Sequence, residues 1–210
     1  MKRTILLLAT CLSLSSAMAE GDKTKSLLRD KPPISNGFYL NFGLGYPSKV
    51  GALNTSGSVS LGTQFNLELG NQWYFVKNDK LGLGIKVTWL QLGYSGYKEG
   101  TSKTNVGDLK LFKFGPQFSI GIGDNVALDV ALDITPTTMF AANSVYDSAY
   151  LYYGVLVGPN IRFRFNRFAV GGELSFGTVK FRNMSSAQNP NGLTNNVNIL
   201  YPRIYVGFKF

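Results

Sequence analysis

The sequence predicts an all-β protein, an eight-stranded antiparallel up-and-down β-barrel that spans a membrane. Three observations carry this prediction. Apolar residues alternate with polar residues or glycine in many segments, which is the period of a strand with one apolar face. The connections between these segments are alternately long and short. The alternation also continues through the last segment, 201–210, up to the terminal Phe210.

The N-terminus has the features of a cleaved export signal. Two basic residues precede an apolar run over 5–14, and Ala17-Met18-Ala19 provides a small-x-small cleavage site. The sequence therefore predicts a signal peptide over 1–19. The alternative, a membrane anchor, needs roughly 20 apolar residues, and this run is shorter. A lipoprotein signal at Cys11 is a second alternative, which the threonine before the cysteine disfavours.

The composition limits the chemistry of the exported chain. Cys11 is the only cysteine and the sequence has no histidine, so we expect no disulfide, no cofactor and no metal site built on thiolate or imidazole ligands. The whole chain carries 21 Lys and Arg against 12 Asp and Glu, and two of these cations lie in the signal. A basic exported protein favours lipopolysaccharide phosphates or anionic lipid as partners. Its basic residues are scattered and form no nucleic-acid motif.

Segment 20–36 is polar, contains two prolines and shows no periodicity, which predicts a flexible periplasmic N-terminal arm. The barrel is then predicted over 37–210. The predicted strands cover 37–46, 58–75, 81–94, 109–122, 126–135, 149–165, 168–179 and the segment that follows 196.

The connections indicate how the barrel is oriented. Long polar connections are predicted at 47–57, 95–108, 141–148 and 183–196. Tight turns are predicted at Lys77-Asn78-Asp79-Lys80, Gly123-Asp124-Asn125 and Asn166-Arg167. An even number of strands with long loops at one end and short turns at the other is typical of outer-membrane barrels. This arrangement predicts that both termini lie on the periplasmic side.

Two strands change their alternation partway along. The apolar positions switch parity after Trp89 in the third predicted strand, and near Leu111–Phe112 in the fourth. A β-bulge inserts one extra residue and would cause such a switch. We therefore expect bulges at these two places, facing each other across the strand pair.

Alternation alone does not decide which face points outward. A soluble lipocalin-like barrel would hide its apolar face, whereas a membrane barrel exposes it to lipid. The glycine-rich polar face and the aromatic residues near predicted strand ends favour the membrane barrel, because aromatic girdles mark the two bilayer interfaces. The predicted girdle consists of Tyr46, Trp73, Phe75, Trp89, Phe163, Phe165 and Phe208.

The inward face then carries many charges. These are Glu68, Lys86, Lys113, Asp129, Asp133, Arg162, Arg164, Glu173, Arg203 and Lys209. Buried charges need partners, and an eight-stranded barrel is just wide enough for side chains to fill. The sequence predicts a salt-bridged plug centred on Glu173, held by Arg203 and by one of Arg162 or Arg164. A narrow, gated polar pathway is the alternative.

Over 37–210 the strand pattern, the loop alternation and the terminal Phe210 resemble those of small eight-stranded outer-membrane barrels of the OmpA transmembrane-domain and OmpX type. The resemblance implies that Phe210 is the signal by which the outer-membrane assembly machinery takes up the chain. It also implies a structural or surface-interaction role, in which long extracellular loops meet lipopolysaccharide, a host molecule or another cell. The alternative is a narrow channel for small or hydrophobic solutes, of the OmpW type.

The same family includes lipid A enzymes, a palmitoyltransferase and a deacylase, which use a histidine together with a serine. This sequence has no histidine to act as the base, so these activities are not expected here. A carboxylate-only enzyme could use Asp129 and Asp133, but interior cations make salt bridges the expected role of both. The sequence therefore predicts a protein that is not an enzyme.

Overall fold

The structure is a computed structural model, and it describes residues 34–50, 62–78, 80–99, 102–143, 148–184 and 195–210. The predicted signal and the predicted arm up to residue 33 lie outside the described residues. Among the described residues, no helix is long and apolar enough to cross a membrane.

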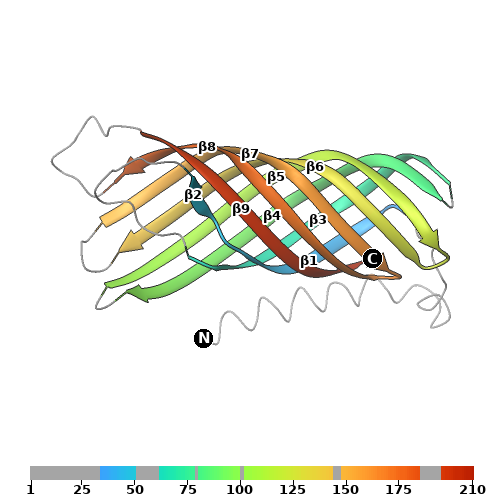
Figure 1. Cartoon of the computed structure of the whole chain (residues 1–210), viewed down its shortest axis with the longest axis horizontal. Coiled ribbons are helices and arrows are strands. Elements are labelled where there is room, and N and C mark those ends of the chain that lie inside the picture. The colour runs from blue at the N-terminus through green and yellow to red at the C-terminus, as the bar shows by residue number, and fades with distance from the viewer. Residues whose placement is uncertain (1–33, 51–61, 79, 100–101, 144–147, 185–194) are drawn as a thin grey trace, which may run out of the picture. The chain divides into compact units, whose positions relative to one another are not determined.

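Antiparallel strands follow each other around a closed ring (Figure 1). The strands are β1 Gly37–Gly45, β2 Ser48–Val50, β3 Gln64–Lys77, β4 Leu81–Glu99, β5 Ser102–Gly123, β6 Val126–Asn143, β7 Ser148–Phe165, β8 Phe168–Asn183 and β9 Asn195–Lys209. β1 pairs with β3, each strand from β3 to β8 pairs with the one that follows it, and β1 also pairs with β9, which closes the ring. Closure gives hydrogen-bond partners to strands that would otherwise be edges. The predicted eight-stranded up-and-down barrel is confirmed, because β2 continues the line of β1 along β9.

The short strand β2 lies where the sequence predicted only a polar connection. Ser48 pairs with Leu200 and Val50 pairs with Asn198, so the chain stays beside β9 after β1 ends. Pro47 separates the two strands and has no N–H to donate to a ladder. The break between β1 and β2 is therefore local, and the ring position is shared.

The prediction of a loop over 95–108 is wrong. Strands β4 and β5 continue into it, and Glu99 pairs with Ser102 at the tip of the described hairpin. β6 also extends to Asn143 and β8 to Asn183, beyond their predicted ends. A strand that leaves hydrocarbon no longer needs an apolar outward face, so the pattern that identifies lipid-facing strands stops before the strands do.

The two predicted bulges are confirmed. The pairing of β3 with β4 skips Trp89, which is the extra residue of its strand. The pairing of β5 with β6 shifts register between Leu109 and Phe114, and Phe112 within this stretch has a positive φ of 54°. This left-handed conformation is uncommon for a bulky residue and fits an irregular position.

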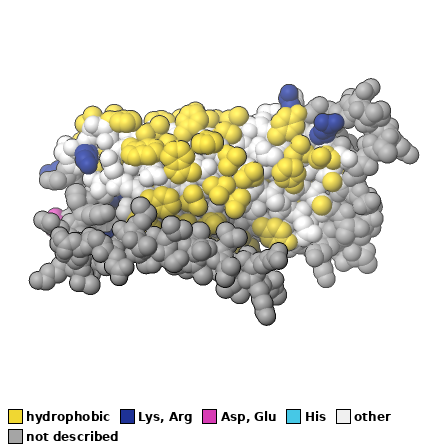
Figure 2. Space-filling model, turned by 180° about the vertical axis from the view of Figure 1, so that it is seen from behind, with side chains coloured by type: hydrophobic (Ala, Val, Ile, Leu, Met, Phe, Trp, Pro, Cys, Tyr) yellow, Lys and Arg dark blue, Asp and Glu magenta, His cyan; other side chains and the backbone are white. Residues whose placement is uncertain are grey.

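Over the middle of the strands, apolar side chains point outward and polar side chains point into the barrel. Phe65 and Ile204 are 73% and 67% exposed, whereas Glu68 and Gln64 on the inward face are fully buried. Figure 2 shows hydrophobic side chains spread along the middle of the visible face, with Lys and Arg toward its ends. This is the reverse of a soluble barrel and the arrangement of a transmembrane barrel. The predicted orientation is confirmed, and the lipocalin-like alternative is wrong.

Candidate functional site

The lumen contains all ten interior charges expected from the sequence. Each of their side chains is buried: Glu68, Lys86, Lys113, Asp129, Asp133, Arg162, Arg164, Glu173, Arg203 and Lys209. Period-two alternation put these side chains on one face of each strand, and closure of the ring turns that face inward. The structure divides most of these charges into separate groups along the lumen.

The central cluster consists of Glu68, Lys86, Lys113, Asp133, Glu173 and Arg203, which come from β3, β4, β5, β6, β8 and β9. Arg203 joins its two sides, because its Nη2 contacts the carboxylate of Glu68 and lies 2.6 Å from Oε2 of Glu173. Glu173 and Arg203 are direct register partners on adjacent strands. Glu68 lies on β3, and β1 lies between β3 and β9, so this bridge links two strands that are not paired with each other.

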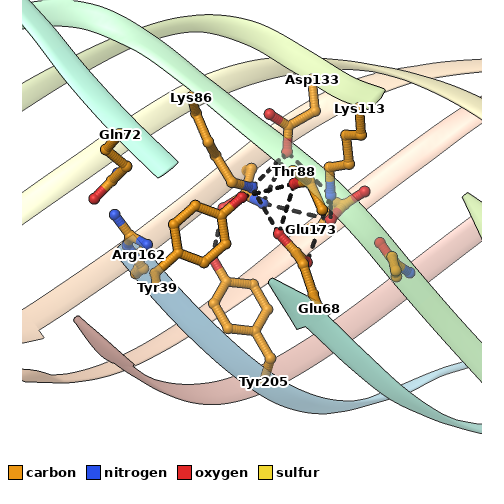
Figure 3. A network of polar contacts seen from close by, with 12 residues as sticks. Tyr39, Glu68, Gln72, Lys86, Thr88, Lys113, Asp133, Arg162, Glu173 and Tyr205 are labelled. Carbon is orange, nitrogen blue, oxygen red and sulfur yellow. Dashed lines mark hydrogen bonds and ion pairs between the residues drawn. The ribbon is translucent and has the colours of Figure 1, made fainter. Parts of the chain in front are cut away.

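The two lysines complete the central cluster from the other side of the lumen (Figure 3). Lys86 Nζ lies 2.9 Å from Oδ2 of Asp133 and 3.3 Å from Oε1 of Glu68. Lys113 Nζ contacts Glu173 and lies 3.2 Å from the same Asp133 oxygen. Three carboxylates thus face three cations, and each carboxylate touches at least two of them. This mutual pairing is what makes buried charges tolerable.

Neutral side chains also donate hydrogen bonds to the carboxylates of the central cluster. Thr88 donates its hydroxyl to Oε1 of Glu68 at 3.0 Å, and Ser175 donates to Oε1 of Glu173 at 2.6 Å. Asn160 donates to Oδ2 of Asp133 at 3.0 Å. A network whose members are multiply bonded holds its side chains in one arrangement, so the cluster cross-links the strands of the barrel.

Glu173→Gln is expected to lower the free energy of unfolding by about 1–3 kcal/mol, because a buried donor loses its charged partner. Arg203 still keeps Glu68, and Lys113 still keeps Asp133, which limits the loss. The measurement is a urea titration of the protein refolded into lipid vesicles. Lys80→Gln, at an exposed turn residue, is the control. Equal midpoints for the two variants would show that the cluster does not stabilise the barrel.

A second group, the Asp129 triad, lies closer to the short turns. Arg162 donates Nε and Nη2 to Oδ2 of Asp129 at 2.9 and 2.6 Å. Arg164 donates Nε to the same oxygen at 2.6 Å and Nη2 to Oδ1 at 3.0 Å. Ser119 also donates to Oδ1 at 2.6 Å. One carboxylate therefore holds two guanidinium groups.

The prediction that Arg162 or Arg164 holds Glu173 is wrong. Asp129 and Arg162 are register partners on β6 and β7, so their side chains leave the sheet side by side. The register partner of Glu173 on β7 is Asn160, not an arginine. The order of the strands suggested the wrong pairing, because it does not give the register. Moving β7 along β8 by two residues would place a different inward side chain of β7 opposite Glu173.

A third charged group, the pair of Lys110 and Asp108, was not predicted from the sequence. Lys110 donates to Asp108, both side chains are buried, and the ammonium group lies 4.1 Å from the ring centroid of Tyr201. In the sequence, Asp108 falls in a predicted loop, and Lys110 is assigned to neither face of the predicted strand that begins at 109. The alternation of Val106, Asp108 and Lys110 was the signal that could have identified them, since all three are buried on one side of β5.

An apolar cluster at the loop end of the lumen was also not expected. We call it the loop-end core, and it consists of Val106, Met139, Ala141, Tyr150, Tyr152, Leu156, Val179, Ile199 and Tyr201, with Phe181 and Val197 packed against it. Tyr150 stacks on Phe181 at 5.3 Å between ring centroids. On the side of the lumen formed by β5 to β9, hydrophobic side chains therefore lie above the charged groups.

The turn end of the lumen is covered by the residues just before β1. Ile34 is 2% exposed, and a Cβ added at Gly82 would come within 2.5 Å of its Cγ2, so only glycine leaves room for it. Tyr74 N donates to Oδ1 of Asn36 at 2.8 Å, and Lys209 donates to the carbonyl of Ser35. The last three residues of the predicted arm, 34–36, therefore contact the barrel, and the flexibility of the arm stays a prediction.

The predicted aromatic girdle is only partly at the strand ends. Phe163, Phe165 and Phe208 are exposed near the short turns. Trp89 instead lies in the middle of β4, because this strand runs on to Glu99, so its predicted place at a strand end is wrong. Trp89 packs edge-to-face on Trp73, at 5.8 Å between ring centroids, and donates its indole N–H to Asn71. The remaining predicted girdle side chains, Tyr46, Trp73 and Phe75, also face outward.

The terminal Phe210 also faces outward and is 56% exposed. Its N–H donates to the carbonyl of Phe38 at 2.8 Å, and the two rings lie 6.3 Å apart. The last residue is therefore fixed to the first strand of the ring. Its use as an assembly signal stays a prediction.

Comparison with known proteins gives similarity in fold. No family model and no curated protein matches the chain. Among solved structures, the chain is similar to Ail, the attachment invasion locus protein of Yersinia pestis, solved with the heparin analogue sucrose octasulfate, at 12% identity and a TM-score of 0.47 over 83% of this chain and 97% of that one. Neisserial surface protein A is 10% identical with a TM-score of 0.46, over 84% of this chain and 100% of that one. The outer membrane protein OprG of Pseudomonas aeruginosa is 14% identical with a TM-score of 0.49, over 83% of this chain and 96% of that one. The likeness is one of barrel architecture, and no functional residue is transferred from it.

Proposed function

We propose that this chain is a non-enzymatic outer-membrane barrel, exported through the signal at 1–19, whose lumen is a stabilising plug and whose function lies on its surface. Its role is structural or is an interaction role of the loops that face the cell exterior. Its partners are outer-membrane lipids and lipopolysaccharide, a host or cell-surface ligand, and the assembly machinery, which reads Phe210.

The observation that carries this proposal is the filling of the lumen at several successive levels. From the turn end, these are Ile34, the Asp129 triad, the central cluster, the Lys110–Asp108 pair and the loop-end core. A solute that crossed would have to part buried ion pairs, and separating one such pair leaves uncompensated charge in a medium of low polarity. It would also have to displace an apolar core. An interior this narrow suits stability better than transport.

The test is the conductance of the purified full-length protein in a planar lipid bilayer. We expect silent bilayers, because the described side chains occupy the lumen at each of these levels. Glu173→Gln provides the matched comparison, since it weakens the central cluster and leaves the loop-end core intact. Steady currents from the unmodified protein would contradict the proposal and favour the narrow channel for small or hydrophobic solutes.

A further inference from the structure

The outward faces of β8 and β9 change from apolar to polar at one level. On β8 the outward side chains Phe168, Val170, Leu174 and Phe176 are followed by Thr178, Lys180 and Arg182. On β9 the change falls between Leu200 and Asn198. These residues pair with Phe176 and Thr178 respectively, so both strands change at the same rung.

The inward faces change in the opposite sense at the same level. Ser175 and Tyr201 are inward-facing register partners at the border between the polar part of the lumen and the loop-end core. Ser175 donates to Glu173, whereas Tyr201 donates its hydroxyl to Asn66 and packs its ring in the loop-end core. The next inward pairs toward the loops include Ile199 and then Val179, which belong to the loop-end core. Below the change these two strands are polar inside and apolar outside, and above it they are apolar inside and polar outside, as in water. The change therefore marks the level at which the barrel leaves hydrocarbon.

The length of the apolar segment agrees with this level. The range 168–176 on β8 has nine residues, and a tilted transmembrane strand needs about 9–11. The register also brings Tyr153 beside Lys180, and Phe140 and Leu151 to the rung of Arg182. Aromatic side chains are typical of the boundary between hydrocarbon and headgroups. Lys180 and Arg182 thus lie at headgroup level.

We propose that Lys180 and Arg182 form a binding surface for the phosphate groups of outer-leaflet lipids. Both side chains are exposed on one face of β8, and two residues along a strand separate their Cα atoms by about 7 Å. Ammonium and guanidinium groups make charge-assisted hydrogen bonds to phosphate oxygens, and guanidinium can make two in parallel. The surface rests on the outer-membrane location proposed above.

The charge distribution singles out an anionic partner. Neither Lys180 nor Arg182 has a carboxylate partner among the described residues, and the described carboxylates of β3, β5, β6 and β8 all face the lumen. The neighbouring outward residues on β9 are Asn196 and Asn198, which are exposed and uncharged. Among the described residues of this part of the barrel surface, none neutralises the two cations, so an anionic ligand is attracted by both of them.

The lipid source is favoured over a free anion because the cations stand directly above the apolar belt. Leu174 and Phe176, on the same face of β8, are 43% and 55% exposed. A phosphorylated lipid can place its acyl chains against these residues while its phosphate reaches Lys180. A free phosphate ion would use only the charges, and a polysaccharide would not use the apolar residues.

The experiment measures the thermal midpoint of the purified full-length protein, folded in zwitterionic detergent, by its heat-modifiable migration on gels. The probes are lipid A with two phosphates, the same lipid with its phosphates removed, and inorganic phosphate. We expect only phosphorylated lipid A to raise the midpoint. The K180Q/R182Q double variant should lose more than half of this rise, and K180R/R182K should keep it.

The matched control is the K77Q/K80Q double variant, which removes two exposed cations at the turn end and should respond like the unmodified protein. An unchanged rise in K180Q/R182Q, or an equal effect of inorganic phosphate, would overturn the proposal. A further probe is a sulfated polysaccharide. The proposal would also be overturned if K180Q/R182Q lost binding to this polysaccharide while its response to lipid A stayed intact. If K180Q/R182Q does not fold, the single variants K180Q and R182Q should each lose part of the rise. Recovery of the protein in a soluble periplasmic fraction would instead contradict the proposed location.

Discussion

Asp129→Asn is expected to lower the free energy of unfolding by at least about 3–5 kcal/mol, the cost of breaking a buried ion pair from one side. Asp129 is the carboxylate to which Arg162 and Arg164 donate, and all three side chains are buried. The variant leaves two guanidinium groups facing each other without an anion. The effect should exceed that of Glu173→Gln, because the partners of Glu173 keep other carboxylates.

The measurement is the urea midpoint of unfolding for protein refolded into lipid vesicles. Asp124→Asn is the matched control, because Asp124 is exposed in the turn that precedes the same strand. A triple variant with Leu at 129 and Met at 162 and 164 should recover much of the loss, since replacing a whole buried ion group by apolar residues is often neutral. Asp129→Asn with the same midpoint as Asp124→Asn would mean that the triad adds nothing to stability.

Val130→Arg is expected to destabilise the inserted barrel by roughly 2–4 kcal/mol, which is the cost of an arginine on the lipid face near the bilayer midplane. Val130 points outward and is 38% exposed, while its neighbour Asp129 points into the lumen. The apolar outward side chains on the same strand, Leu128 and Leu132, place Val130 within the lipid-facing belt.

The same vesicle titration checks this result. Ala142→Arg is the control, because Ala142 is outward on the same strand but close to its loop end. There an arginine should cost only about 0–1 kcal/mol. The informative quantity is the difference in the free energy of unfolding between Val130→Arg and Ala142→Arg. If Val130→Arg and Ala142→Arg cost the same, then β6 does not cross the hydrocarbon at Val130.

The sequence by itself determined the eight membrane-spanning strands, their two faces and the two bulges, but not the short strand β2 or the loop-side ends of the strands. Alternation is a local property, because neighbouring residues of a strand always point to opposite sides. The parity changes at Trp89 and near Phe112 were therefore readable without knowing any partner strand. The same pattern put the interior charges on one face. It failed over 95–108, where no apolar outward face marks the extended hairpin.

Only the tertiary structure decided which interior charges meet. Arg203 contacts Glu68, which lies on a strand far away in the sequence. Arg162 and Arg164, which the order of the strands placed next to Glu173, both bind Asp129 instead. The loop-end core likewise joins side chains from five strands. Contacts across a closed barrel depend on the register of every pairing in the ring, and one rung of shift replaces a neighbour by another. The sequence of one strand does not specify the registers of the other strand pairs. The interior partners of a side chain can therefore be identified only from the structure of the closed barrel.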